Sequence, residues 1–170
     1  MKLSRLLFAS AAIAVASSAS AADLLTPVPI TDSQLFDFEG MYIGGTLGAA
    51  WTGSTAGTLG VVVGTNFAIT DGIIAGAEFQ GDAYFNGGGV TGYDALGLGR
   101  IGGFVGDNTL AYVSAGGGLA GGSAVYAIGG GLEMAMTDQL SIRGEVQGLG
   151  TWGSTPSVGK ANVGLLWHLN

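Results

Sequence analysis

The chain has 170 residues, of which 34 are glycine and none is cysteine, and it carries 12 acidic and 5 basic residues for a formal net charge of −7. Only 10% of the residues are charged while 48% are apolar, which excludes a disordered chain and is too little charge for the surface of a soluble domain. The lack of cysteine excludes disulfides and thiolate metal sites, and the negative charge argues against a nucleic-acid partner.

The first residues have the features of a secretory signal peptide. A basic start, Met1–Arg5, is followed by an uncharged apolar run, Leu6–Ala16, and then by small residues up to Ala22. Residues 1–21 are therefore expected to be a cleaved signal peptide, and the mature chain would carry a charge of 3 − 12 = −9. Residues 22–38, with two prolines and three aspartates, are expected to form an extended periplasmic leader.

Beyond the leader, apolar residues recur with the period of two that is typical of strands. Near the C-terminus, for example, Leu140, Ile142 and Val146 alternate with Arg143 and Glu145. The predicted strands are 40–51, 58–68, 72–85, 93–105, 109–117, 124–136, 140–148 and 158–169. Short turns that contain aspartate alternate with Gly/Ser/Thr loops of about five to ten residues, which is typical of transmembrane barrels. Residues 39–170 are therefore predicted to be an all-β, eight-stranded, antiparallel up-and-down transmembrane β-barrel.

Aromatic residues lie near both ends of the predicted strands. Those near the loop ends are Trp51, Phe85, Tyr93 and Tyr126, and those near the turn ends are Phe67, Tyr112 and Trp167. Two interfacial girdles of aromatic side chains flank the apolar band of a membrane barrel, so these seven residues are predicted to form them.

Several segments resemble successive strands of the small porin-family outer-membrane barrels of Gram-negative bacteria. They are MYIGGTLGAAW, NFAITDGIIAGAEFQGDAYF, GRIGGFVGDNTLAYVSAGG, AIGGGLEMAMTDQLSIRGEVQGLG and ANVGLLWHLN. The resemblance implies an eight-stranded barrel that the outer-membrane assembly machinery inserts. Such barrels usually end on an aromatic residue that the machinery reads, whereas this sequence ends Trp167-His168-Leu169-Asn170. Either Trp167 and Leu169 carry the signal instead, or insertion is less efficient.

The motifs that could carry catalysis or cofactor binding lack their required context. Residues 97–102 match G-x-G-x-x-G, but a dinucleotide site also needs a following helix and an acid about twenty residues on. His168 is the single histidine, is expected at the rim of the last strand, and is accompanied by no G-x-S-x-G motif. Clustered oxygens for a hard cation are also lacking, because Glu133 and Glu145 have basic neighbours. No enzymatic activity, cofactor or metal site is predicted.

The three basic residues of the mature chain are predicted to form structural ion pairs inside the barrel. Hairpins centred on Gly89, on Asp138 and between Trp152 and Gly153 would set each base directly opposite an acid. The predicted pairs are Glu78–Arg100, Glu133–Arg143 and Glu145–Lys160. The alternative is that these residues line a charge-selective path.

The leading functional hypothesis is a small integral outer-membrane barrel with a structural or envelope role and a lumen filled by side chains. A narrow channel for small solutes and a surface adhesin that acts through its loops are the alternatives. The expected partners are outer-membrane lipid and the outer-membrane assembly machinery, without nucleic acid, and a monomer is expected in the cell outer membrane.

Overall fold

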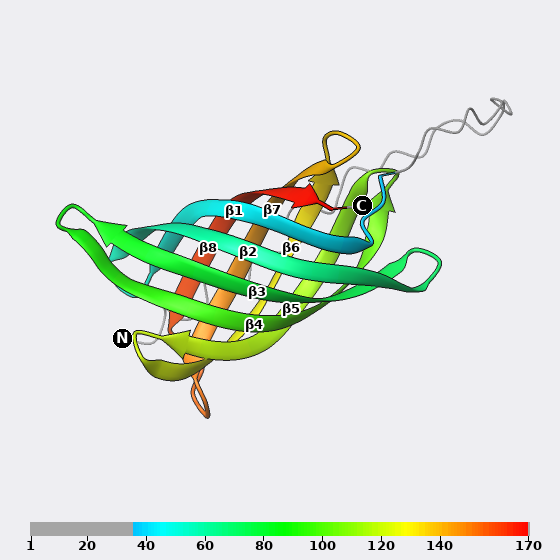
Figure 1. The fold of residues 1–170 in the computed structure, drawn as a ribbon. Coiled ribbons are helices and arrows are strands. Elements are labelled where there is room, and N and C mark those ends of the chain that lie inside the picture. The colour runs from blue at the N-terminus through cyan, green and yellow to red at the C-terminus, as the bar shows by residue number, and fades with distance from the viewer. Residues whose placement is uncertain (1–35, 170) are drawn as a thin grey trace, which may run out of the picture. The chain divides into compact units, whose positions relative to one another are not determined.

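Residues 36–169 are described by a computed structural model, and they form eight strands that close into a barrel (Figure 1). The strands are β1 (Gly40–Trp51), β2 (Thr55–Thr70), β3 (Ile73–Asn86), β4 (Gly89–Gly106), β5 (Thr109–Ala120), β6 (Ser123–Ala135), β7 (Leu140–Thr151) and β8 (Val158–His168). Within this described range no helix is long and apolar enough to cross a membrane. The predicted signal peptide, residues 1–21, and the leader as far as residue 35 lie outside the described residues.

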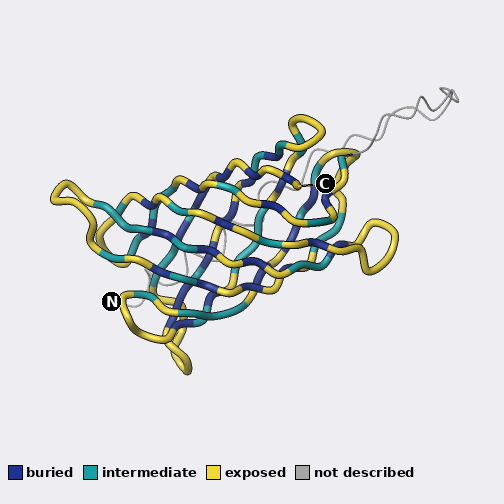
Figure 2. The backbone as a smooth tube through the Cα atoms, in the orientation of Figure 1, coloured by how far each residue is buried: buried dark blue, intermediate teal, exposed yellow. Residues whose placement is uncertain are grey.

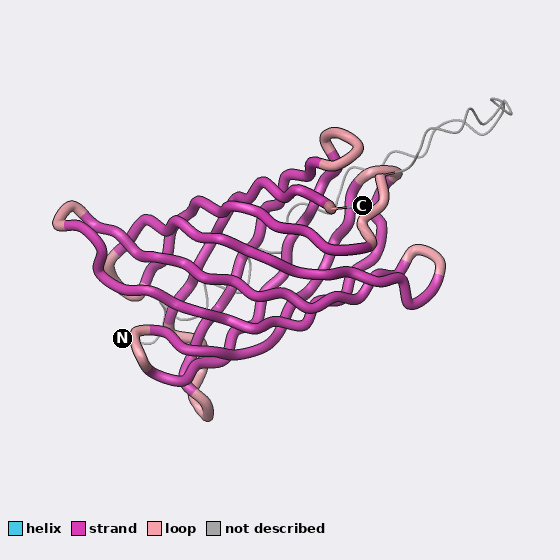
Figure 3. The backbone as a smooth tube through the Cα atoms, in the orientation of Figure 1, coloured by secondary structure: helices cyan, strands magenta, loops and turns pink. Residues whose placement is uncertain are grey.

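Every strand pairs antiparallel with its neighbours in the sequence, and β1 pairs with β8 to close the ring. Figure 3 shows that strands make up almost the whole wall, with loops only at its two ends. Closure leaves no strand edge unpaired, so the backbone donors and acceptors of the wall are satisfied within the sheet. The predicted eight-stranded, antiparallel, up-and-down barrel is confirmed.

Six of the seven connections are shorter than the sequence pattern predicted, and the turn between β6 and β7 is one residue longer. At the loop end of the barrel they are residues 52–54, 87–88, 121–122 and 152–157, and at the turn end they are 71–72, 107–108 and 136–139. The expected loops of Gly, Ser and Thr instead continue the ladders of β2, β4, β5 and β7, because ladder hydrogen bonds come from the backbone and need no particular side chain. At the β2–β3 turn, Gly72 has a φ of 80°, a conformation that glycine adopts without strain.

The two faces of the wall differ sharply in polarity. Large apolar side chains are exposed on the outside of every strand, among them Leu47, Val61 and Val146. Figure 2 shows the resulting alternation of exposed and buried residues along each strand. None of the charged residues in the eight strands lies on the outer face. A soluble monomer rarely exposes an apolar patch larger than a few hundred Å², whereas hydrocarbon is a suitable solvent for such a band.

Two valines with equal exposure test whether the outer face lies in hydrocarbon. Val61 in the middle of β2 and Val105 at the turn end of β4 are both 65% exposed. In a bilayer, Val61→Arg should cost about 2–4 kcal/mol of folding free energy and Val105→Arg about 0–1 kcal/mol, because the cost of a charge depends on its depth. Unfolding titrations in lipid vesicles measure both. Equal costs would contradict a membrane-facing exterior.

Candidate functional site

All eight charged residues of the strands point into the lumen, where each is at most 6% exposed. They are Glu78, Asp82, Asp94, Arg100, Glu133, Arg143, Glu145 and Lys160. The set includes all six residues that the sequence predicted as lumen ion pairs. Because an unpaired charge away from water is costly, the contacts among these side chains determine whether the lumen is stable.

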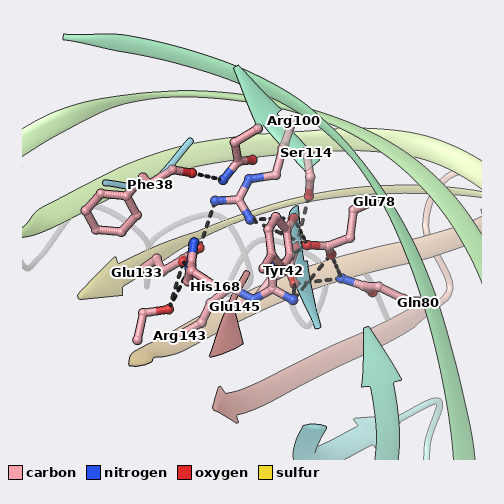
Figure 4. Close-up of polar contacts among 12 residues, drawn as sticks. Phe38, Tyr42, Glu78, Gln80, Arg100, Ser114, Glu133, Arg143, Glu145 and His168 are labelled. Carbon is pink, nitrogen blue, oxygen red and sulfur yellow. Dashed lines mark hydrogen bonds and ion pairs between the residues drawn. The ribbon is translucent and has the colours of Figure 1, made fainter. Parts of the chain in front are cut away.

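Glu78 of β3 lies at the centre of the larger of two charged clusters (Figure 4). Its carboxylate forms ion pairs with Arg143 at 2.5 Å and with Arg100 at 3.4 Å. The Tyr42 hydroxyl and the Gln80 amide also donate hydrogen bonds to it. Strands β1, β3, β4 and β7 are thus connected through one carboxylate, on which two guanidinium groups converge from opposite parts of the wall.

Glu133 of β6 extends this cluster toward the turn end. One of its carboxylate oxygens accepts a hydrogen bond from Arg100 Nη2 at 2.8 Å. The other accepts one from Ser141 Oγ at 2.8 Å and lies 3.0 Å from His168 Nε2. The Arg100 guanidinium also lies over the ring of Tyr112, 4.2 Å from its centroid, where a cation–π interaction contributes further.

Glu145 of β7 extends the same cluster toward the loop end. It accepts hydrogen bonds from Gln80 Nε2 at 2.9 Å and from Ser114 Oγ at 3.1 Å, and it lies 3.9 Å from Arg143 Nη2. Neutral donors therefore supplement the two arginines. Each of the three carboxylates in this cluster has at least one arginine within ion-pair distance.

Lys160 of β8 forms the second charged cluster, nearer the loop end. Its ammonium group contacts Asp82 at 2.9 Å and Asp94 at 3.1 Å, two residues that face each other directly across β3 and β4. Thr46 Oγ1 donates to Asp82 at 3.1 Å, and the Tyr84 hydroxyl donates to Asp94. One cation thus separates two carboxylates that would otherwise repel each other.

Two of the three predicted cross-strand pairings are wrong in register. Glu78 is opposite Leu98 rather than Arg100, and Glu145 is opposite Asn162 rather than Lys160. Both loop-side hairpins are displaced by two residues, since β3 and β4 close over the two-residue turn 87–88 with a bulge, and β7 and β8 close over 152–157.

The third register, Glu133 opposite Arg143, agrees with the pairing in the structure. The two side chains nevertheless do not form an ion pair with each other. Arg143 reaches across the lumen to Glu78, and Glu133 binds Arg100. Glu78 and Arg100 are in contact, but diagonally. Lys160 binds Asp82 and Asp94 on the opposite part of the wall. Neither aspartate belongs to a predicted pair.

The predicted aromatic girdle residues fall into two groups. Phe67, Tyr93 and Trp167 are exposed on the outer wall, and Trp51, Phe85 and Tyr126 are half-buried at the loop ends of their strands. Tyr112 is the exception, because it is buried in the lumen between Leu110 and Ser114. Its assignment to a girdle is wrong, since its position in the alternation of β5 directs it inward under Arg100.

Ser141, His168 and Glu133 come together, although the sequence placed His168 at the rim without such partners. Ser141 Oγ and a Glu133 oxygen both approach the same atom, His168 Nε2, at 3.3 and 3.0 Å. A relay of the hydrolase type needs the acid on the other ring nitrogen, so that the histidine can accept the serine proton. The three residues therefore form a buried hydrogen-bonded group and not a nucleophilic triad.

The loop end of the lumen contains a cavity of about 320 Å³. Tyr84, Leu149 and Val158 contribute to its walls, with Thr52 and Thr91 among the hydroxyl-bearing residues. Within residues 36–169, no group of three or more His, Asp or Glu side chains could hold a metal ion. The cavity is thus lined by apolar, aromatic, hydroxyl and amide groups rather than by charges.

The central cluster gives a direct test of ion-pair energetics. Glu78→Gln or Arg143→Met should each cost about 3–5 kcal/mol, because removal of one partner leaves a buried charge uncompensated. The double variant should cost less than the sum, which urea unfolding in detergent micelles measures. The exposed turn variant Asp138→Asn should stay within about 0.5 kcal/mol of the parent. Additive costs would show that the two residues are not coupled.

No protein-family model matches the sequence, and no curated protein matches it significantly. The N-terminal β-barrel domain of Pseudomonas aeruginosa OprF is similar in structure, with a TM-score of 0.56 and 15% identity over 76% of this chain and 97% of that one. A de novo designed transmembrane β-barrel has a TM-score of 0.52 and 15% identity over 76% of this chain and 94% of that one. At this identity the likenesses show the fold alone, which is that of a small transmembrane β-barrel.

Proposed function

We propose that this protein is an integral outer-membrane barrel with a structural, envelope-supporting role and without enzymatic activity. The observation that carries the proposal is the filled lumen, in which eight charged side chains at most 6% exposed are held by one another across the barrel. Eight strands enclose an interior just wide enough for side chains, so such a network occupies the space a pore would need. The apolar outer wall supports residence in a bilayer.

The proposed partners follow from the same features. Outer-membrane lipid would cover the apolar wall, and the outer-membrane assembly machinery would insert the barrel. We propose a monomer, because closure of the barrel already satisfies the edges of β1 and β8 without a second chain.

Fractionation tests the proposed location. The mature protein is expected in the outer-membrane fraction, where it should migrate faster on gels before heating than after it. The unheated form stays compact because its closed hydrogen-bonded wall resists detergent, and boiling unfolds it. Recovery of the protein in the soluble periplasm would contradict the proposal.

A narrow solute channel is the alternative that a specific observation favours, namely the cavity of about 320 Å³ at the loop end. Conductance in planar bilayers distinguishes the two functions. The filled lumen predicts no steps above background for the parent protein, because the Glu78 and Lys160 clusters lie across any path through the barrel. Reproducible conductance steps would favour the channel.

An adhesin role has less support from this chain, because the loops 52–54, 87–88, 121–122 and 152–157 offer little surface for recognition. Loop 152–157 is the longest of them, and binding to host surfaces that disappears when it is shortened would favour that role.

A further inference from the structure

The residues just before β1 enter the turn end of the barrel instead of leading away from it. Phe38 is 1% exposed and packs against Ile74 and Leu110, with Phe36 and Ala135 partly buried against the same cluster. From the sequence, residues 36–38 are expected to be part of the periplasmic leader. The structure places them with the barrel, because their rings complete an apolar cluster that the strands alone leave open.

The backbone of this segment is held in place as well as its rings. Asn66 Nδ2, on β2, donates a hydrogen bond of 2.8 Å to the carbonyl of Phe38 (Figure 4). Asn66 is itself buried, so the amide cannot exchange this acceptor freely for water. The Phe38 ring also meets the ring of Phe104 at 5.6 Å between centroids.

The segment lies directly against the end of the charged network. The ring of Phe36 meets that of His168 edge-on, with centroids 4.7 Å apart, and Phe38 lies 6.0 Å from the same ring. His168 in turn contacts Glu133, which binds Arg100. The contacts of Phe36 and Phe38 come from β2, β3, β4, β5 and β8, and therefore extend across the turn end of the lumen.

We propose that Phe36 and Phe38 form a plug that seals the turn end of the lumen. The plug keeps water from the network that begins at His168 and Glu133. Ion pairs in a dry environment are stronger than the same pairs in contact with water, so the seal stabilises the network behind it. Toward the loop end, a separate buried apolar cluster of Leu96, Leu98, Val125, Ala127 and Leu149 lies next to the cavity of about 320 Å³, which shares Leu149 with it.

Single cysteines can report the seal, because the chain contains none of its own. Ser141 is fully buried beside His168 and Glu133, immediately behind the plug. The experiment uses the purified Ser141→Cys barrel in detergent micelles. It measures the rate at which a small charged methanethiosulfonate labels the new thiol. In a Phe36→Ala/Phe38→Ala background the labelling rate should rise by at least about ten-fold, because a buried group reacts through locally open states.

Matched controls separate the seal from general loosening. Phe67→Ala removes a phenylalanine ring that is exposed on the outer wall, so it should leave the labelling rate of Ser141→Cys unchanged. Thr58→Cys, 1% exposed on β2 near the loop end of the lumen, should react equally with and without the plug. Asn66→Ala should accelerate labelling less than loss of both rings, because only the anchor is removed.

The outcomes that overturn the plug are specific. They are fast labelling of Ser141→Cys with the plug intact, no acceleration when both rings are removed, or equal acceleration by Phe67→Ala. If Ser141→Cys does not show the heat-dependent gel shift of a folded barrel, Ala135→Cys replaces it as the reporter. Ala135 packs against the cluster of Phe38, Ile74 and Leu110. Because labelling is measured in micelles, its result does not depend on the proposed outer-membrane location, which fractionation tests separately.

Discussion

The structure depends on one constraint, which is that every charge inside a narrow closed barrel must be held by an opposite charge or by hydrogen-bond donors. An eight-stranded ring has room for side chains but for little water, and an unpaired charge there costs several kcal/mol. The lumen contains five carboxylates, and all three basic residues of the described chain lie among them. No base remains for the surface. The same constraint explains why Glu78 serves two arginines and Lys160 serves two aspartates.

The sequence placed six of the eight charged strand residues in the lumen, where they lie, but it did not predict the partners of most of them. Alternation with a period of two determines which side chains point inward, and this pattern placed Glu78, Arg143 and Lys160 in the lumen. The partner depends on the register of each hairpin and on how the ring closes, neither of which local alternation determines. Arg143 of β7 reaches Glu78 of β3 because the lumen is narrower than the reach of an arginine side chain. Such contacts appear only after closure.

Glycine explains how long side chains fit in so narrow a space. Tyr42 is directly opposite Gly64, and Tyr112 is directly opposite Gly131, in adjacent strands. A Cβ atom at either glycine would collide with the facing tyrosine ring. The two rings therefore occupy the space that side chains at these positions would fill, and the Arg100 guanidinium lies over both of them. The assignment of Tyr112 to an aromatic girdle on the outer wall concealed this fit at the level of the sequence.

The two ends of the barrel differ in charge in a way that the lumen does not require. Outside the lumen, the charged residues of the described chain are Asp37, Glu39, Asp71, Asp107 and Asp138, all acidic and all at the turn end. The four loop-end connections carry no charge. Hydrated carboxylates resist transfer through hydrocarbon, whereas Gly, Ser and Thr loops cross at lower cost. Insertion with the loop end leading therefore moves no solvated charge through the bilayer, and it leaves the acidic end, with Phe36 and Phe38 beside it, on the side from which the barrel enters.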